Sequence, residues 1–221
     1  MKVGSRFAWG IGLLIVCGAA VVGALNVRDE INVTATAAFA PSDSLIERGA
    51  YLVRAGNCMA CPTLRGSASY AGGLGIATPF GTVCISNLTP DSNTRIGNWL
   101  SAHFWRAMHN GRSKNGRLLY PAFPFTSYTQ ITRTDSDAIH SFLRSQPAVK
   151  QPNRPPSLNF PFNTQAALAI WRALYFRQGV YQSDASRTTW WNRGGLIWSM
   201  GWAIAVPVIL RVMCWAAHGT R

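Results

Sequence analysis

The sequence predicts a mainly α-helical domain with long loops, placed between an N-terminal membrane segment and an apolar C-terminal tail. Apolar residues recur at helical spacing in four stretches, and segments rich in Gly, Ser, Thr and Pro separate these stretches. Two longer runs, at residues 7–25 and 194–210, are apolar and contain no charged residue. The 221 residues therefore suit one domain of ordinary size with an additional segment at each end.

Shifts in composition give the boundaries of these parts. They are a signal peptide or membrane anchor at 1–26, a linker at 27–41, the helical domain at 42–150, a connector with one helix at 151–193, and the tail at 194–221. The linker is rich in Ala and Thr, and the connector opens with a Pro- and Asn-rich stretch that favours an extended chain.

The apolar run at residues 7–25 has the length of a membrane span and follows the positive residues Lys2 and Arg6. No clean Ala-x-Ala cleavage site follows the run, which favours an uncleaved anchor over a signal peptide. Because positively charged flanks stay in the cytoplasm, the anchor would place the domain on the periplasmic side of a bacterial inner membrane.

The first helix of the domain is predicted at Ser44–Ala55, where Ser44 can open a capping box, and it ends just before two cysteines. Cys58 and Cys61 stand at C-x-x-C spacing. In an exported protein this pair is typical of covalent haem attachment, whose full signature C-x-x-C-H adds a histidine as the proximal iron ligand. Here Pro62 takes the place of that histidine, and proline cannot ligate iron.

Other interpretations of the cysteine pair remain open on the residues alone: a structural disulfide, half of a zinc site, or a thioredoxin-like redox pair. A zinc site needs two more nitrogen or sulfur ligands, and the sequence holds no second C-x-x-C and no H-x-x-x-H. A redox pair of the thioredoxin type should open a helix after a strand, whereas this pair follows a helix.

Three further helices are predicted beyond the cysteine pair. Residues 66–90 are rich in Gly, Ser and Thr, which predicts a long loop with a short extended piece at 82–86. The helices are expected at Trp99–His109, where Asn98 can serve as the cap, at Thr134–Ser145 and at Asn163–Phe176.

The imidazole, thioether and remaining thiol groups of the domain are expected to have structural roles. His103, Met108 and His109 lie on the second predicted helix and are interpreted as packing or helix-face residues. His140 lies off the apolar face of its helix, so it is expected to be solvated. Cys84 is expected to be a half-buried thiol without a metal.

Several short motifs follow one another along residues 42–194: RGAYLVRAGNCMAC, AGGLGIATPFGTV, SNLTPD, FWRAMHNGRSKNGRLLYPAFPFTSY, QPNRPPSLNFPFN and WNRG. On these motifs the chain resembles the multihaem cytochrome c subunit of bacterial membrane-bound alcohol, aldehyde and gluconate dehydrogenases. The resemblance implies a class I cytochrome c-like domain in which the first and third helices cross. That family carries three C-x-x-C-H sites, and this chain spans the first.

The resemblance also implies the roles of the site residues. Cys58 and Cys61 would attach one haem c, with Pro62 at the proximal ligand position. The loop at 119–128 matches the family's loop that supplies the distal methionine, and Phe123 stands in place of that methionine. Since neither Pro62 nor Phe123 can ligate iron, the sequence predicts at most one haem, at a degenerate site.

The function implied by the resemblance is electron transfer from a dehydrogenase catalytic subunit towards a respiratory-chain acceptor, with no catalytic residue and no substrate chemistry in this chain. A second hypothesis is an inert remnant without functional haem, because both axial positions lack a donor. A third is a thiol–disulfide protein that uses Cys58 and Cys61.

The net charge of +13 and the pI of about 10.5 narrow the choice of partners. The positive residues are spread along the chain, and only Arg112, Lys114 and Arg117 form a local cluster. This spread disfavours nucleic-acid binding, and it favours an acidic protein partner or a membrane surface with anionic lipid.

The tail at 194–221 has a second reading. The codons that could encode residues 194–212 can also be read in a frame shifted by one base. In that frame they can encode GAYLVDGLGHCGACHTPR, which matches the second haem-attachment segment of the resembling family. The Trp and Met residues of this stretch have unique codons, and all of them agree with the shifted reading. We therefore expect an out-of-frame peptide in which Cys214 and His218 carry no role; the alternative is a second membrane segment, and the codons of the gene distinguish the two.

Overall fold

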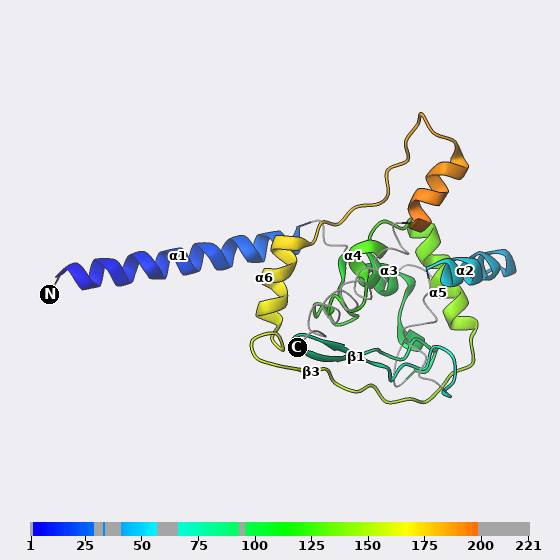
Figure 1. The fold of residues 1–221 in the computed structure, drawn as a ribbon, viewed down its shortest axis with the longest axis horizontal. Helices are drawn as coiled ribbons and strands as arrows, with labels where there is room; N and C mark the ends of the chain where they lie inside the picture. The colour runs from blue at the N-terminus through cyan, green and yellow to red at the C-terminus, as the bar shows by residue number, and fades with distance from the viewer. Residues whose placement is uncertain (1, 29–32, 34–40, 57–65, 93–95, 199–221) are drawn as a thin grey trace, which may run out of the picture.

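The computed structural model describes residues 2–28, 33, 41–56, 66–92 and 96–198 (Figure 1). Its helices are α1 (Lys2–Val27), α2 (Asp43–Ala55), α3 (Ser101–Asn110), α4 (Phe125–Tyr128), α5 (Arg133–Ser145) and α6 (Gln165–Tyr175), with a 3-10 turn η1 (Ile96–Asn98). Its strands are β1 (Gly75–Thr78), β2 (Gly81–Cys84) and β3 (Ser157–Leu158). Residues 189–198 are also helical. The described part is mainly helical, as the sequence predicts.

The ends of the predicted helices shift by one or two residues because other side chains supply the caps. Ser42, and not Ser44, is the N-cap of α2, where its hydroxyl accepts a hydrogen bond from the Leu45 amide at 3.3 Å. The predicted cap Asn98 instead donates to the carbonyl of Ser92 at 2.8 Å. As a result Asn98 closes η1, and α3 begins at Ser101 after an extended Leu100.

A small antiparallel sheet forms in the predicted loop region. β1 pairs with β2, and β3 adds to the other edge of β2, with Thr82 opposite Ser157. The extended piece predicted at 82–86 overlaps β2, and β3 lies in the stretch predicted to be extended. The sheet therefore joins the loop after α2 to the connector after α5.

The helices α2 and α5 cross in direct contact, which confirms the predicted crossing (Figure 1). Gly49 is buried at the crossing, and a β-carbon there would lie 2.7 Å from the carbonyl carbon of Ala138 and 2.8 Å from Cβ of Phe142. An ion pair spans the same crossing, since Arg48 Nη2 lies 2.6 Å from Oδ1 of the buried Asp135. Thr132 caps α5 and also donates to Asp135 Oδ2 at 2.9 Å, so the carboxylate is held from both helices.

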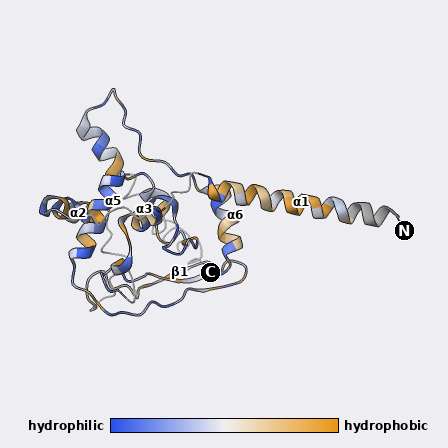
Figure 2. Cartoon of the chain, turned by 180° about the vertical axis from the view of Figure 1, so that it is seen from behind, coloured by the Kyte–Doolittle hydropathy of each residue, from blue (hydrophilic) through white to orange (hydrophobic). Residues whose placement is uncertain are grey.

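The helix α1 projects from the domain and is mostly hydrophobic (Figure 2). Within the described residues, Ala8–Val27 is the one stretch long and apolar enough to cross a membrane, with a mean hydropathy of 2.2. Its last turn is attached to the domain: Asn26 Nδ2 donates to the carbonyl of Ala169 in α6 at 2.9 Å, and Arg112 Nη2 donates to the carbonyl of Asn26 at 2.9 Å. The end of α1 is therefore in contact with α6 and with the turn that follows α3.

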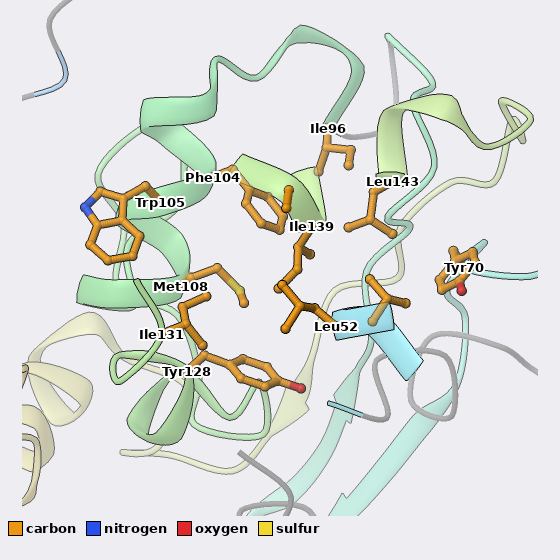
Figure 3. Packing of buried hydrophobic residues seen from close by; sticks show 12 residues of the cluster. Leu52, Tyr70, Ile96, Phe104, Trp105, Met108, Tyr128, Ile131, Ile139 and Leu143 are labelled. Carbon is orange, nitrogen blue, oxygen red and sulfur yellow. The ribbon is translucent and has the colours of Figure 1, made fainter. Parts of the chain in front are cut away.

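The core of the domain is one cluster drawn from α2, α3, α4, α5 and the loops between them (Figure 3). Its buried members are Leu52, Val53, Tyr70, Ile96, Phe104, Trp105, Met108, Tyr128, Ile131, Ala138, Ile139 and Leu143. Leu196 and Ile197, from the helix at 189–198, pack against this cluster from outside. Residues on both sides of the segment 57–65 thus contribute to a single core.

Candidate functional site

In the sequence, the predicted site follows α2 and includes the loop at 119–128, which leads into α4. Cys58, Cys61 and Pro62 fall in 57–65, outside the described residues. Gly56, the last described residue before this segment, accepts a hydrogen bond from the buried Tyr128 hydroxyl at 3.2 Å. The bond ties the end of the helix that leads to the cysteines to the end of the loop that contains Phe123.

Phe123 is half-buried and packs against the core cluster. Its ring centroid lies 5.6 Å from that of Tyr128, whose hydroxyl reaches Gly56. The structure therefore brings the loop at 119–128 next to the end of α2. Phe123 offers only a hydrocarbon ring at the matched distal position, and Pro62 offers no donor at the proximal one, so the residues at the matched positions do not fit axial ligation of haem iron.

A buried polar cluster holds the SNLTPD motif in place. Asn87 and Thr89 are fully buried, and Asn87 Nδ2 donates to the carbonyl of Val149 at 2.7 Å. Asn87 Oδ1 accepts from the amide and the hydroxyl of Thr89, at 2.8 and 2.7 Å, and the Thr89 hydroxyl accepts from the Val149 amide at 3.1 Å. Asn153 adds a further bond to the amide of Asn87 at 3.0 Å. The structural role of these residues was not predicted from the sequence, in which their only signal is that they lie in the motifs SNLTPD and QPNRPP.

The residues of α3 behave as predicted. Met108 is buried and points towards Leu52 and Tyr128 in the core (Figure 3). His103 Nδ1 accepts from the amide of Leu100 at 3.1 Å and so caps the helix. His109 Nδ1 bonds the carbonyl of Thr129 at 2.8 Å, and burial lowers the pKa of His109 while that hydrogen bond partly opposes the shift.

His140 was expected to be solvated, and this expectation is wrong. The residue is 5% exposed and stacks on the ring of Phe104, with the ring centroids 5.0 Å apart. Among the described residues its Nε2 has no hydrogen-bond partner. Burial, assisted by the positive charges of Arg144 and Arg133, lowers the pKa of His140 to about 4. A neutral imidazole is compatible with this aromatic contact, and the amphipathic pattern failed because it treats every histidine as polar.

The buried imidazole predicts a loss of stability on mild acidification. The folded-state pKa of about 4 lies below the ordinary value of about 6.5, so the unfolded chain binds the proton more readily. The contribution is complete above about pH 6.5 and falls as the pH drops towards 4. Between pH 7.5 and 5 we expect the free energy of unfolding to fall by about 2 kcal/mol from this group.

Urea unfolding of the full chain in detergent at the two pH values measures this loss. The variant His140→Leu should lose about 2 kcal/mol of the difference between pH 7.5 and 5, and the remainder comes from other groups such as His109, whose pKa is also lowered. A variant that keeps the full pH dependence would contradict the assignment to His140.

The remaining thiols and acids form no metal centre within the ranges that the structure describes. Cys84 ends β2 as a free, half-buried thiol, as expected. The candidate site therefore consists of Cys58 and Cys61, which lie outside the described residues, and of Gly56, Tyr128 and Phe123, of which Tyr128 contacts the other two.

No protein-family model matches the chain. Curated proteins do match it. One of the subunits of the nicotinate dehydrogenase of Pseudomonas putida is 41% identical over 197 residues, which cover 87% of this chain and 17% of that protein. The gluconate 2-dehydrogenase cytochrome c subunit of Pantoea cypripedii is 40% identical over 135 residues, or 61% of this chain and 31% of that subunit. The cytochrome c subunit of the alcohol dehydrogenase (quinone) of Gluconacetobacter polyoxogenes is 39% identical over 144 residues, or 64% and 31%.

This chain spans about a sixth to a third of the length of these three relatives. Two of the three are cytochrome c subunits of dehydrogenases that differ in substrate, and their matches cover more than half of this chain. The likeness therefore concerns the cytochrome subunit that such complexes share.

Proposed function

The chain is a homologue of the cytochrome c subunits of gluconate and quinone-dependent alcohol dehydrogenases, and on this premise we propose that residues 42–150 are an electron-transfer domain of a membrane-bound dehydrogenase complex. The domain would have the class I cytochrome c fold, with one covalent haem c at Cys58 and Cys61 as its cofactor. Its partners would be a dehydrogenase catalytic subunit and an acceptor of the respiratory chain.

One arrangement carries the proposal. The end of α2 and the loop at 119–128 meet through the bond from Tyr128 to Gly56, with Phe123 packed beside Tyr128. The crossing of α2 with α5 at Gly49 fixes α2, the helix that precedes the attachment motif in the sequence. Gly56, at the end of α2 and just before the attachment motif in the sequence, is thus held to the loop with the matched distal-ligand motif. When bound, a haem would supply one-electron chemistry there; these residues hold the polypeptide around its place.

The lack of axial ligands at the matched positions favours a second candidate function. Pro62 and Phe123 leave both matched axial positions without a ligand, which favours an inert remnant that carries no working haem. The third hypothesis, a thiol–disulfide protein, uses the same Cys58 and Cys61 without any cofactor.

A single preparation tests all three. The full chain is exported in a host that matures c-type cytochromes, and membranes are analysed by haem staining, visible spectroscopy and thiol titration. Covalent haem in the unmodified chain supports the electron-transfer domain. Two free thiols without haem support the remnant. A reversible disulfide between Cys58 and Cys61, without haem, supports the thiol–disulfide protein.

The orientation of the domain follows from the anchor proposed at residues 1–26, and it gives a separate prediction. A periplasm-specific reporter fused after Pro41 should be active, and the full protein should pellet with membranes after an alkaline wash. A cytoplasm-specific reporter at the same position should be inactive and serves as the control. Soluble protein that begins near residue 26 would show instead that the segment is cleaved.

A further inference from the structure

Helix α6 has an unusual distribution of side chains for a helix at the surface of a domain. Its only charged residue, Arg172, is buried and donates to the carbonyl of Asn110. Its exposed large side chains are Ile170, Leu174 and Tyr175. A helix that turns its charge inwards and its apolar residues outwards is expected to meet an apolar medium and not water.

The position of α6 identifies that medium. α6 packs against the last turn of α1, where Asn26 bonds the carbonyl of Ala169. Figure 1 shows α6 running across the axis of α1, on the side of the domain from which α1 projects. Because the candidate span ends at Val27, a bilayer crossed by α1 would begin beside Ala169. α6 would then lie along the membrane surface.

Aromatic and positively charged residues near α6 have the character expected of a surface that faces lipid. Phe160 and Phe162, in the loop that leads into α6, are both exposed, and aromatic residues are enriched at the membrane interface. The chain contains no Asp or Glu at 138–183 or at 92–134, whereas Asp29 and Glu30 follow α1 in the sequence and lie outside the described residues. Exposed arginines lie next to both ends of α6: Arg117 precedes Leu118, whose backbone bonds Gln165, and Arg177 follows the C-terminal end. Positive charge beside an apolar face complements anionic lipid headgroups.

We propose that α6, together with Phe160 and Phe162, is a membrane-interface helix that rests in the lipid headgroup region around α1. This proposal depends on the proposed role of α1 as an anchor. The outward side chains of α6 would lie about 5–10 Å into the boundary between headgroups and acyl chains. The occupant of the apolar face is phospholipid, with anionic headgroups at Arg117 and Arg177.

Photocrosslinking in the full-length protein tests the proposal. The photoreactive residue p-benzoylphenylalanine replaces one residue at a time, in vesicles of phosphatidylcholine and phosphatidylglycerol and in native membranes. Leu174, 60% exposed on α6, is the test position. Trp9, 79% exposed on α1, reports on the anchor, and Trp190, 82% exposed on the helix at 189–198, is the matched control on another element. After irradiation, mass spectrometry measures the yield of phospholipid adduct.

We expect phospholipid adducts at Leu174 and Trp9 at a yield several-fold above that at Trp190. Adducts at Trp9 but not at Leu174 overturn the α6 proposal and leave the anchor intact. Adducts at Leu174 but not at Trp9 overturn the proposal in this form, because α6 would then meet lipid without α1 as an anchor. Equal yields at all three positions, adducts at neither Leu174 nor Trp9, or a polypeptide adduct at Leu174 in native membranes each overturn the proposal.

Discussion

The variant Pro62→His is expected to carry far more covalent haem at Cys58 and Cys61 than the unmodified chain, in which attachment is impaired by Pro62. The substitution completes the C-x-x-C-H signature and supplies the missing proximal ligand. The framework beside it is already present, since Tyr128 holds the end of α2 at Gly56. The haem iron of this variant should be high-spin or bind an adventitious ligand, because Phe123 leaves the distal side without a donor.

Haem staining and the visible spectrum of the exported protein measure this change. Pro62→Ala is the matched control, because it removes the proline without adding a ligand and should not gain haem. Adding Phe123→Met to Pro62→His should shift the spectrum towards the low-spin form. A normal low-spin c-type spectrum from the unmodified chain, or no haem on Pro62→His, would refute this account of the site.

The second large effect is expected at the crossing of α2 and α5. The variant Gly49→Ala should lower the free energy of unfolding by about 2–3 kcal/mol, since the new β-carbon would lie 2.7 Å from the carbonyl carbon of Ala138 and 2.8 Å from Cβ of Phe142. Both contacts are with atoms that cannot rotate away, so the helices must separate. The higher helix propensity of alanine offsets about 1 kcal/mol of the cost of the clash, and the expected net loss of about 2–3 kcal/mol already includes this offset.

Chemical unfolding of the full chain in detergent measures the loss. Gly179→Ala is the control, because a β-carbon at Gly179 meets nothing within 4 Å, and it should change stability by less than about 0.5 kcal/mol. If Gly49→Ala were as stable as Gly179→Ala, the close approach of the two helices would be wrong.

The sequence predicted the elements whose apolar residues repeat regularly. The helices α2, α5 and α6 lie within one or two residues of their predicted ranges. Their buried residues, such as Leu52 and Val53 of α2, face the core on one side of the helix, and this one-sided burial produces the helical spacing in the sequence. The start of α3 was missed by two residues because Asn98 bonds Ser92, a contact that spacing cannot show. His140 was misplaced for a related reason, since its burial depends on Phe104 from a different helix.

Part of the candidate site could likewise be predicted from the sequence, and part could not. The resemblance matched Phe123 to the family's distal methionine, which stays a prediction, and the structure shows that this loop reaches α2 through Tyr128 and Gly56. Periodicity could not reveal that Arg172 points inwards to Asn110, because an arginine in a helix is normally assigned to solvent. The apolar outer face of α6 became visible only once the buried side of the helix was known.

With α1 as the proposed membrane anchor, the attachment of Asn26 to both Ala169 and Arg112 would affect how the domain meets its proposed partners. A domain on a flexible tether samples a wide volume above the bilayer, whereas a domain fixed to the end of its own span cannot tilt or rise freely. Its search for a partner would therefore be lateral diffusion within the plane of the bilayer, at one constant height. A partner whose docking surface lies at a different height above the bilayer would itself have to extend to contact the domain.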